Sequence, residues 1–211
     1  SLTAGVFVGI RQLVQGPQLK SLVTARIQNP LTTSVSIDQV NFKWKSLSSG
    51  ILESQGIRIG QLSTDPVEIN IDKLEMSLDF SEIFLGNLDI GFLDIISPRI
   101  LIDAKKLKSH LTELTSTNSP QVFLNPVIKT LRIKDGSILT QNSSRPNQGF
   151  ETLLSKIECN AGNIGIDGIE RFEFQGLSSD GMTVGRIELT GNLDASENGE
   201  HLGNTKSFVK F

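Results

Sequence analysis

Cysteine is almost absent from the 211 residues: Cys159 is the only one, so the chain forms no internal disulfide and no site built from several thiolates. Tyrosine is missing and one Trp is present, which argues against an aromatic platform for sugars or single strands. No apolar run reaches the roughly 18 to 20 residues that cross a bilayer. The formal charge of −3, from 20 basic and 23 acidic side chains, lacks the positive field that phosphate binding requires, so nucleic acid is not an expected partner.

The composition, 37% hydrophobic and 20% charged residues, is that of a folded domain with a core to bury. Residues 1–16 begin with an apolar run from Leu2 to Ile10. This run is either the stub of a longer hydrophobic segment, such as a membrane anchor, or an ordinary first helix. Residues 194–211 are polar and contain glycine until the last few positions, and we expect a flexible tail there.

Three short stretches have helical patterns. Pro17 precedes apolar residues at helical spacing, which predicts a short helix over 18–28. A turn capped by Ser81 is expected over 81–85, and a modest helix over 104–114.

Most of the remaining chain alternates apolar and polar residues with a period of two, the pattern of half-buried strands. The candidate strands are 35–44, 51–59, 67–80, 88–96, 100–103, 128–134, 137–141, 154–161, 171–177 and 183–193. The dipeptide Asp135-Gly136 lies between two of them and predicts a tight hairpin turn.

In two candidate strands the apolar residues change parity partway along. The change occurs between Ile37 and Val40, and again after Ile71. The simplest cause is a β-bulge at Asp38–Gln39 and another at Asp72–Lys73. Such bulges would bend both strands and curve the sheet.

The sequence therefore predicts a mainly β fold of the α+β class, a curved antiparallel sheet with a short N-terminal helix and one or two further short helices. Two polar loops, 115–121 and 142–149, offer little to bury and place a soft boundary near residue 118. We expect a first β-rich subdomain with the helix over 17–118 and a second antiparallel β subdomain over 119–193.

The sequence contains no clear reactive constellation. His110 and His201 are far apart and share no acidic or cysteine-bearing motif, so we interpret them as surface or helix-face residues. Cys159 falls on the apolar parity of a strand, where a small buried hydrophobe is expected rather than a nucleophile. The carboxylates are scattered over polar strand faces, without a marked acid pair. We therefore expect no catalytic residue, metal site or cofactor.

Three other motifs have ordinary interpretations. The glycines of 162–168 lack the basic residue and helix of a phosphate-binding loop, so a loop between strands is expected. Residues 142–144 fit the N-glycosylation pattern, which is common by chance. The lysines of 105–108 form either a solvated helix face or a weak contact for anionic headgroups.

One strand face is a candidate binding surface. Parity places five residues on a continuous apolar surface: Met76, Leu78, Phe80, Ile100 and Ile102. Alternation reports which side chains avoid water and not what covers them. This surface is therefore either a core beneath the helix at 18–28 or the wall of a groove.

The order of segments is more informative than any motif. A near-terminal apolar run and a short helix precede SVSIDQVNFKW, GILESQGIRIG and VEINIDKLEMSLDFSEIFLGNLDIGFLDIISPRILID, and a polar loop then leads to IKTLRIKDGSILTQNSS. This arrangement, over about residues 17–193, resembles the N-terminal region of the AsmA-like superfamily, which includes TamB and YhdP. The resemblance lies in the small turn SEIFLGNL, the segment SPRILID and the segment LRIKDGSIL. The chain departs from the family in lacking an unmistakable anchor and in carrying NPLTTSVSI where the family has a glycine-containing stretch.

The resemblance implies a non-enzymatic segment of a protein that is anchored in the bacterial inner membrane and projects into the periplasm. It implies a curved β-groove for lipid transport or outer-membrane assembly, with phospholipid or another acyl lipid as ligand. The remainder of the full-length chain and envelope assembly proteins would be partners. A structural alternative is an assembly scaffold whose apolar face is a closed core. A hydrolase of glycans or esters would need a cleft of converging acidic or nucleophilic residues, and the sequence indicates none.

Overall fold

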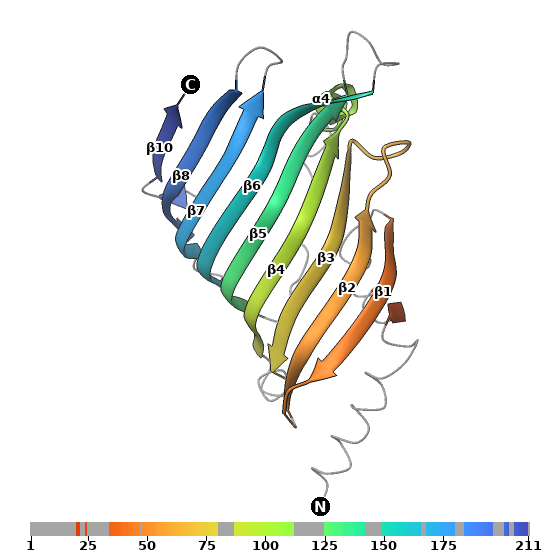
Figure 1. Cartoon of the computed structure of the whole chain (residues 1–211), viewed down its shortest axis with the longest axis vertical. Helices are drawn as coiled ribbons and strands as arrows, with labels where there is room; N and C mark the ends of the chain where they lie inside the picture. The colour runs from red at the N-terminus through yellow and green to blue at the C-terminus, as the bar shows by residue number, and fades with distance from the viewer. Residues whose placement is uncertain are drawn as a thin grey trace, which may run out of the picture.

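The computed structural model is dominated by one layer of β-sheet (Figure 1). It describes residues 20, 21, 24, 34–46, 48–79, 87–111, 125–141, 149–165, 168–179, 184–195, 201–202 and 205–210. The sheet is open, with β1 at one edge and β10 at the other. The prediction of a mainly β fold is confirmed.

Ten strands form the sheet: β1 (Val35–Trp44), β2 (Ser49–Ile59), β3 (Val67–Asp79), β4 (Asn87–Ile102), β5 (Asn125–Gln141), β6 (Phe150–Gly165), β7 (Gly168–Ser179), β8 (Val184–Ala195), β9 (His201–Leu202) and β10 (Thr205–Lys210). Their order follows the chain from β1 to β8 and ends with β10, while β9 also pairs with β8. All pairs are antiparallel except β4 and β5, which are parallel. The expectation of a wholly antiparallel sheet is wrong at this pair, where the chain crosses back through residues 103–124.

The sheet is continuous across the boundary predicted near residue 118. β4 and β5 lie on either side of it and pair from Asn87 to Ile102. The division into two subdomains stays a prediction.

A short helix, α4 (Ala104–Leu111), begins the crossover and agrees with the helix predicted over 104–114. Asp103 caps it, since its Oδ1 accepts hydrogen bonds from the amides of Lys105 at 3.0 Å and Lys106 at 3.2 Å. The Lys106 ammonium donates to two carbonyl oxygens of the loop between β2 and β3, one of them at 3.0 Å. This lysine therefore ties α4 to that loop and is not part of a purely solvated face.

Other predicted helices are described only in part. Residues 20, 21 and 24 are helical, in agreement with the helix predicted over 18–28, and its remaining positions lie outside the described residues. The turn predicted over 81–85, the motif at 142–144 and residues 1–16 also lie outside them. Within the described ranges, no helix has the length and hydropathy needed to cross a membrane.

Within the tail predicted to be flexible over 194–211, the structure describes β9 and β10, and the flexibility of the tail stays a prediction. β10 pairs with β8 from Thr205 to Lys210. It satisfies backbone groups that the edge of β8 would otherwise expose.

The hairpin predicted at Asp135-Gly136 is wrong, because β5 runs through both residues. Asp135 has a left-handed backbone with φ of 53°, which kinks the strand without reversing it. Gly136 is buried, and a Cβ there would lie 3.1 Å from Ile157 and 3.2 Å from Pro98. Close approach from both neighbouring strands, rather than a turn, accounts for this glycine.

A line of irregular positions, here called the first crease, crosses β1 to β6. On either side of it, apolar positions in a strand are three residues apart instead of two. The extra residues lie within Asp38–Gln39, Gln55–Gly56, Asp72–Lys73, Ile96–Ser97, Lys134–Asp135 and Ser155–Lys156. Four of these residues have positive φ: Gly56, Ser97, Asp135 and Lys156. From β1 to β5 the extra residues lie at one level, so ladder pairs are missing there but the register does not shift.

A second crease crosses only β4 to β7. Its extra residues lie within Gly91–Phe92, Lys129–Thr130, Gly162–Asn163 and Glu170–Arg171. Because β3 and β8 lack an extra residue at this level, the register shifts at the β3–β4 and β7–β8 borders. Most unpaired positions inside the ladders that join β1 to β8 lie on or directly beside one of the two creases. Leu153 in β6 is an exception, at the register shift between Ile138 and Leu139 of β5.

The two β-bulges predicted at Asp38–Gln39 and Asp72–Lys73 both fall on the first crease. The parity change in β1 is confirmed, since Asp38 and Gln39 are both exposed while Ile37 is 2% exposed. Bulges confined to single strands are wrong, because a bulge opposes two residues to one and no register shift occurs at Asp38 or Asp72. The cause of each parity change is an irregularity shared by neighbouring strands.

Candidate functional site

Residues paired across neighbouring strands lie on the same face of a sheet, so the ladders show which side chains lie together. Five rows cross β1 to β8 on one face, and each is named by its residue in β1. The Trp44 row contains Trp44, Gly50, Leu78, Ile90, Ile128, Ile164, Ile169 and Leu193. The Phe42 row contains Phe42, Leu52, Met76, Leu93, Leu131, Ala161, Phe172 and Gly191. The Val40 row contains Val40, Ser54, Leu74, Ile95, Ile133, Cys159, Phe174 and Leu189. The Ile37 row contains Ile37, Ile57, Ile71, Pro98, Gly136, Ile157, Gly176 and Ile187. The Val35 row contains Val35, Ile59, Ile69, Ile100, Ile138, Leu154, Ser178 and Gly185.

These five rows are here called the apolar face. No position in them carries a charged side chain, and Ser54, Cys159 and Ser178 are the members that are neither aliphatic, aromatic nor glycine. The rows stay on one face across the first crease, since Val40 and Leu74 pack against the buried cluster of the Ile37 row. The extra residue in each strand restores the parity that keeps apolar side chains together.

The apolar face is partly exposed in the described part of the chain. The buried hydrophobic side chains are Ile37, Leu52, Ile57, Ile71, Ile90, Ile157 and Ala161. The other hydrophobic members of the five rows are only half-buried. Figure 1 shows the cause, because the strands form one curved layer and α4 lies at one end of it. The result is a wide apolar surface that remains in contact with solvent.

The creases favour a bend of the sheet toward the apolar face. At each crease a strand places two consecutive residues on the opposite face, as Asp38 and Gln39 show by their exposure. The extra residue lengthens that face, which favours curvature with the apolar face on the inner side.

The structure places four of the five residues named from the sequence on this face, and Phe80 lies outside the described residues. Met76 and Leu78 belong to the Phe42 and Trp44 rows. Ile100 pairs with Ile69 in the Val35 row, and Ile102 continues the face one step farther along β4. All four are half-buried. They form two groups on opposite sides of the first crease, so they share a face without forming one contact cluster.

The opposite face of the sheet is polar. Between the Val40 and Phe42 rows runs the Asn41 row, which contains Asn41, Glu53, Glu75, Asp94, Arg132, Asn160, Glu173 and Thr190. Each of its carboxylates has a cationic partner: Lys43 for Glu53, Lys73 for Glu75, Arg132 for Asp94 and Arg171 for Glu173. The charges of the central strands are thus confined to one face and balanced there.

Two of these ion pairs have well-defined geometry. Arg132 binds Asp94 with both ends of its guanidinium, at 2.7 Å from Nε to Oδ1 and 2.6 Å from Nη2 to Oδ2. This hydrogen bonding to Asp94 raises the pKa of Arg132. Lys43 donates to Glu53 Oε1 at 2.7 Å, and that hydrogen bond lowers the pKa of Glu53 despite the opposing effect of desolvation. The pKa shifts of Arg132 and Glu53 both favour the charged forms of these groups, which does not suit either one to general acid or base catalysis.

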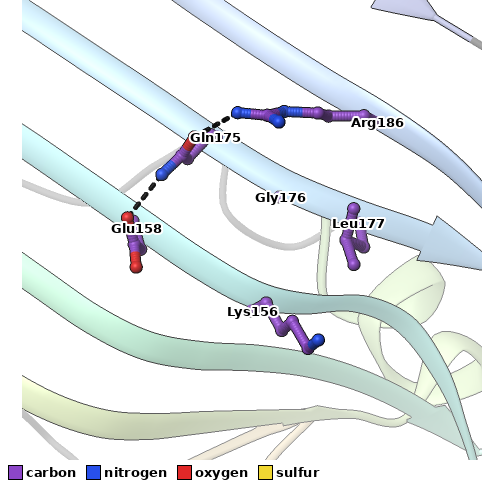
Figure 2. A pocket seen from close by; sticks show the side chains of 6 residues that line it. All are labelled: Lys156, Glu158, Gln175, Gly176, Leu177 and Arg186. Carbon is purple, nitrogen blue, oxygen red and sulfur yellow. Dashed lines mark hydrogen bonds between the residues drawn. The ribbon is translucent and has the colours of Figure 1, made fainter.

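A hollow of about 230 Å³ lies on the polar side of β6, β7 and β8, where the first crease ends (Figure 2). Arg186 Nη2 donates to Gln175 Oε1 at 2.8 Å, and Gln175 Nε2 donates to Glu158. Leu177 and Lys156 also line the hollow (Figure 2). Its polar groups bond to one another across three strands, and the lining residues form no nucleophile and base pair.

The cysteine and the two histidines form no common reactive site among the described side chains. Cys159 lies on the apolar face opposite Ile133 and Phe174, and burial raises the pKa of its thiol, which disfavours the nucleophilic thiolate. His110 is in α4 and His201 in β9, and their side chains lie outside the described residues. Among the side chains that the structure describes, no three His, Cys, Asp or Glu form a group that could hold a metal ion.

Sequence reasoning missed most of the apolar face. Its largest omission is the β7 and β8 end, where Phe172, Phe174, Ile187 and Leu189 extend the rows. These strands have clean alternation, so the signal was available in the sequence. What alternation alone does not give is the register that joins them to β3 and β4.

Comparisons with protein-family models, with curated proteins and with solved structures give no match to this chain. Its function is therefore inferred from its own residues and geometry.

Proposed function

We propose that this chain is a non-enzymatic segment of a β-groove that binds the acyl chains of phospholipids or of other lipids. One observation carries the proposal: the apolar face extends over five rows and eight strands without a charged residue, and it remains partly exposed. The resemblance to AsmA-like proteins supports the wider context of a periplasmic protein that is anchored in the inner membrane. In that context the segment serves lipid transport or outer-membrane assembly, together with the rest of its chain and envelope assembly proteins.

The chemistry of the apolar face matches that of a hydrocarbon chain. An acyl chain offers no hydrogen-bonding group, so a surface of aliphatic and aromatic side chains meets it without leaving polar atoms unpaired. Each methylene removed from water contributes about 0.8 kcal/mol. Strands lie about 4.8 Å apart, so a row across eight strands is roughly 34 Å long. That length is about twice the depth of one leaflet in a hydrocarbon core of roughly 30 Å.

The alternative is an assembly scaffold in which the same face is a closed core. The buried cluster of Ile37, Ile57 and Ile71 favours this interpretation locally, since these side chains are 2%, 3% and 8% exposed. A scaffold would require the half-buried rows to be covered by protein. It would then retain no lipid, and this difference separates the two functions.

The test is lipid analysis of the purified chain combined with photo-crosslinking to an acyl-chain probe. Leu131→Asp places a charge in the Phe42 row, and Thr130→Asp places the same charge on the adjacent, exposed residue of the second crease. We expect lipid in the organic extract of the unmodified chain and of Thr130→Asp. Crosslinking should fall at least tenfold in Leu131→Asp.

Circular-dichroism melting separates a blocked groove from an unfolded one. If Leu131→Asp melts cooperatively and loses crosslinking, the groove is supported. If the unmodified chain yields no lipid and no crosslink, the scaffold replaces the groove. If Leu131→Asp unfolds, Leu131→Gln supplies a milder variant with the same comparison.

The absence of an enzymatic role has its own test. Cys159→Ala removes the thiol while keeping a small apolar side chain on the apolar face. We expect lipid crosslinking and melting temperature to stay close to those of the unmodified chain. A loss of biological activity at unchanged stability would return an enzyme to consideration.

A further inference from the structure

Both creases interrupt the hydrogen-bonded ladders along continuous lines. In the first crease, Asp38 lacks a ladder partner in β2, Gly56 lacks one in β3 and Asp72 lacks one in β4. Between β4 and β5, Ser97 and Pro98 both lack a partner. Ladder bonds hold neighbouring strands at a fixed distance and angle, so a sheet resists bending least where all of its ladders are interrupted at one level.

We propose that the two creases are flexure lines, along which the sheet changes curvature and opens or closes the concave apolar face. The proposal does not depend on what occupies that face. It concerns a mechanical property of the sheet that a closed-core scaffold would share with a lipid-binding groove.

The backbone conformation at the creases supports such motion. Ser97, Asp135, Lys156 and Asn163 are not glycines, and their φ values lie between 48° and 53°. The left-handed region is less favourable than the extended one for these residue types. A change of one of these residues to the extended region would alter the bend of its strand.

The central strands contain a further weakness at the first crease. Pro98 has no amide hydrogen and lies inside β4, where a ladder would use one. Its neighbour across the parallel pair is Gly136, which has no side chain to lock against it. This part of the sheet combines a missing donor with a missing side chain at one level.

The first crease does not reach β8, which gives an internal reference. The ladder between β7 and β8 is unbroken from Phe172 to Ser179 on one side and from Gly191 to Val184 on the other. Flexure along the first crease therefore moves the two halves of β1 to β6 against each other, while β7 and β8 remain straight at that level.

Distances between spin labels test the proposal, in a Cys159→Ala background. Thr130→Cys with Ser137→Cys spans the first crease within β5, a central strand, at about 23 Å for seven residues. Arg186→Cys with Asn192→Cys is the control within β8, at about 20 Å for six residues, and it spans the same level in a strand that the first crease does not reach. We expect a distance distribution for the β5 pair at least twice as wide as that for the β8 pair. Equal widths would overturn the proposal.

Hydrogen exchange on the unmodified chain gives an independent answer if the labelled variants do not fold. Amides of β5 at Asp135 and Gly136 should exchange at least tenfold faster than those of β8 at Ile187 and Glu188. Equal protection in the two segments would also overturn the proposal. Asp135→Gly should speed exchange at the crease further, because glycine adopts both backbone conformations freely.

Discussion

The first five strands and β8 solve the same problem differently. In β1, Val35 and Ile37 are on the apolar face below the first crease, and Val40 and Phe42 continue it above with a change of parity. In β8, Ile187 and Leu189 stay on that face by plain alternation. Both solutions produce an uncharged surface, but the buried hydrophobic side chains of the described residues all lie in β1 to β6, and those of β8 stay partly exposed.

Burial along the apolar face is uneven between these regions. Ile57, beside the first crease, is 3% exposed, whereas Ile187, the β8 member of the same Ile37 row, is half-buried. A bend toward the apolar face brings side chains of adjacent rows into contact with one another. On a straight strand, side chains of adjacent rows stay farther apart and keep more contact with water. The sheet has no second layer in its described part, and the creases therefore help side chains of adjacent rows to pack against one another.

The largest expected effect is that of a charge introduced beside the crease. Ile57→Asp buries an unpaired carboxylate and should lower the free energy of unfolding by about 4 kcal/mol or more. Leu189→Asp, on the straight part, should cost about half as much, because the carboxylate is able to reach solvent. Urea unfolding followed by circular dichroism measures both. Equal losses would contradict the link between crease and burial.

A smaller effect follows from the backbone at Gly56. Its φ is 61°, and an added Cβ would collide with the Asp38 carboxylate, so Gly56→Ala should cost about 2 to 3 kcal/mol. Gly176 lies in the part of β7 away from the second crease and has no positive φ, and its Cβ would meet Ile157 at 3.5 Å, an ordinary contact. Gly176→Ala should therefore change stability by less than about 0.5 kcal/mol. A tolerated Gly56→Ala would show that the crease backbone is not fixed by that residue.

The same substitution should have opposite signs in the two regions. Ser97 has φ of 50° on the first crease, so Ser97→Gly relieves strain and should stabilise by up to about 1 kcal/mol. Ser178 lies in regular β7, where Ser178→Gly should destabilise by about 0.5 to 1 kcal/mol. Thermal melting of the two variants decides the matter. If both variants were less stable than the unmodified chain, the backbone at Ser97 would not be strained.

The smallest effect concerns acid stability of the creased region. Because the pKa of Glu53 is lowered in the folded chain, its contribution is present above the unfolded value, near 4.3 for glutamate, and is lost as pH falls through the lower folded value. Melting temperature should therefore decline more below about pH 4 in the unmodified chain than in Glu53→Gln. Lys43→Met, which removes the partner, should flatten the profile in the same way. If the pH dependence of the melting temperature were unchanged in both variants, the Lys43–Glu53 pair would make no contribution to acid stability.

Most strands could be predicted from alternation, since half-buried strands must place polar side chains on one side. The continuity of β4 and β5 could not, because Ser97-Pro98 and Asp135-Gly136 have the composition of turns. Their role depends on neighbours in other strands, which close over Gly136 and leave Pro98 without a ladder partner in β5. A local pattern contains no information about those neighbours.

The apolar face could likewise be predicted only in part from the sequence. Parity identified Met76, Leu78, Ile100 and Ile102 as apolar-face candidates, and the structure places them on one face. It did not show that the face continues to Phe174 and Leu189, because this requires the parallel pairing of β4 with β5. Pairing partners of that kind are chosen by the whole fold.

That parallel pair also bears on how the chain folds. On either side of it, neighbouring strands are joined in sequence order and pair antiparallel, from β1 to β4 and from β5 to β8. Such meanders close short loops, whereas the β4–β5 pair must close a loop of more than twenty residues, which costs more entropy. We expect the two meanders to form first and the seam between them last. Until that step, each half exposes an unpaired central strand, and the chain is then most open to pairing with a second copy of itself.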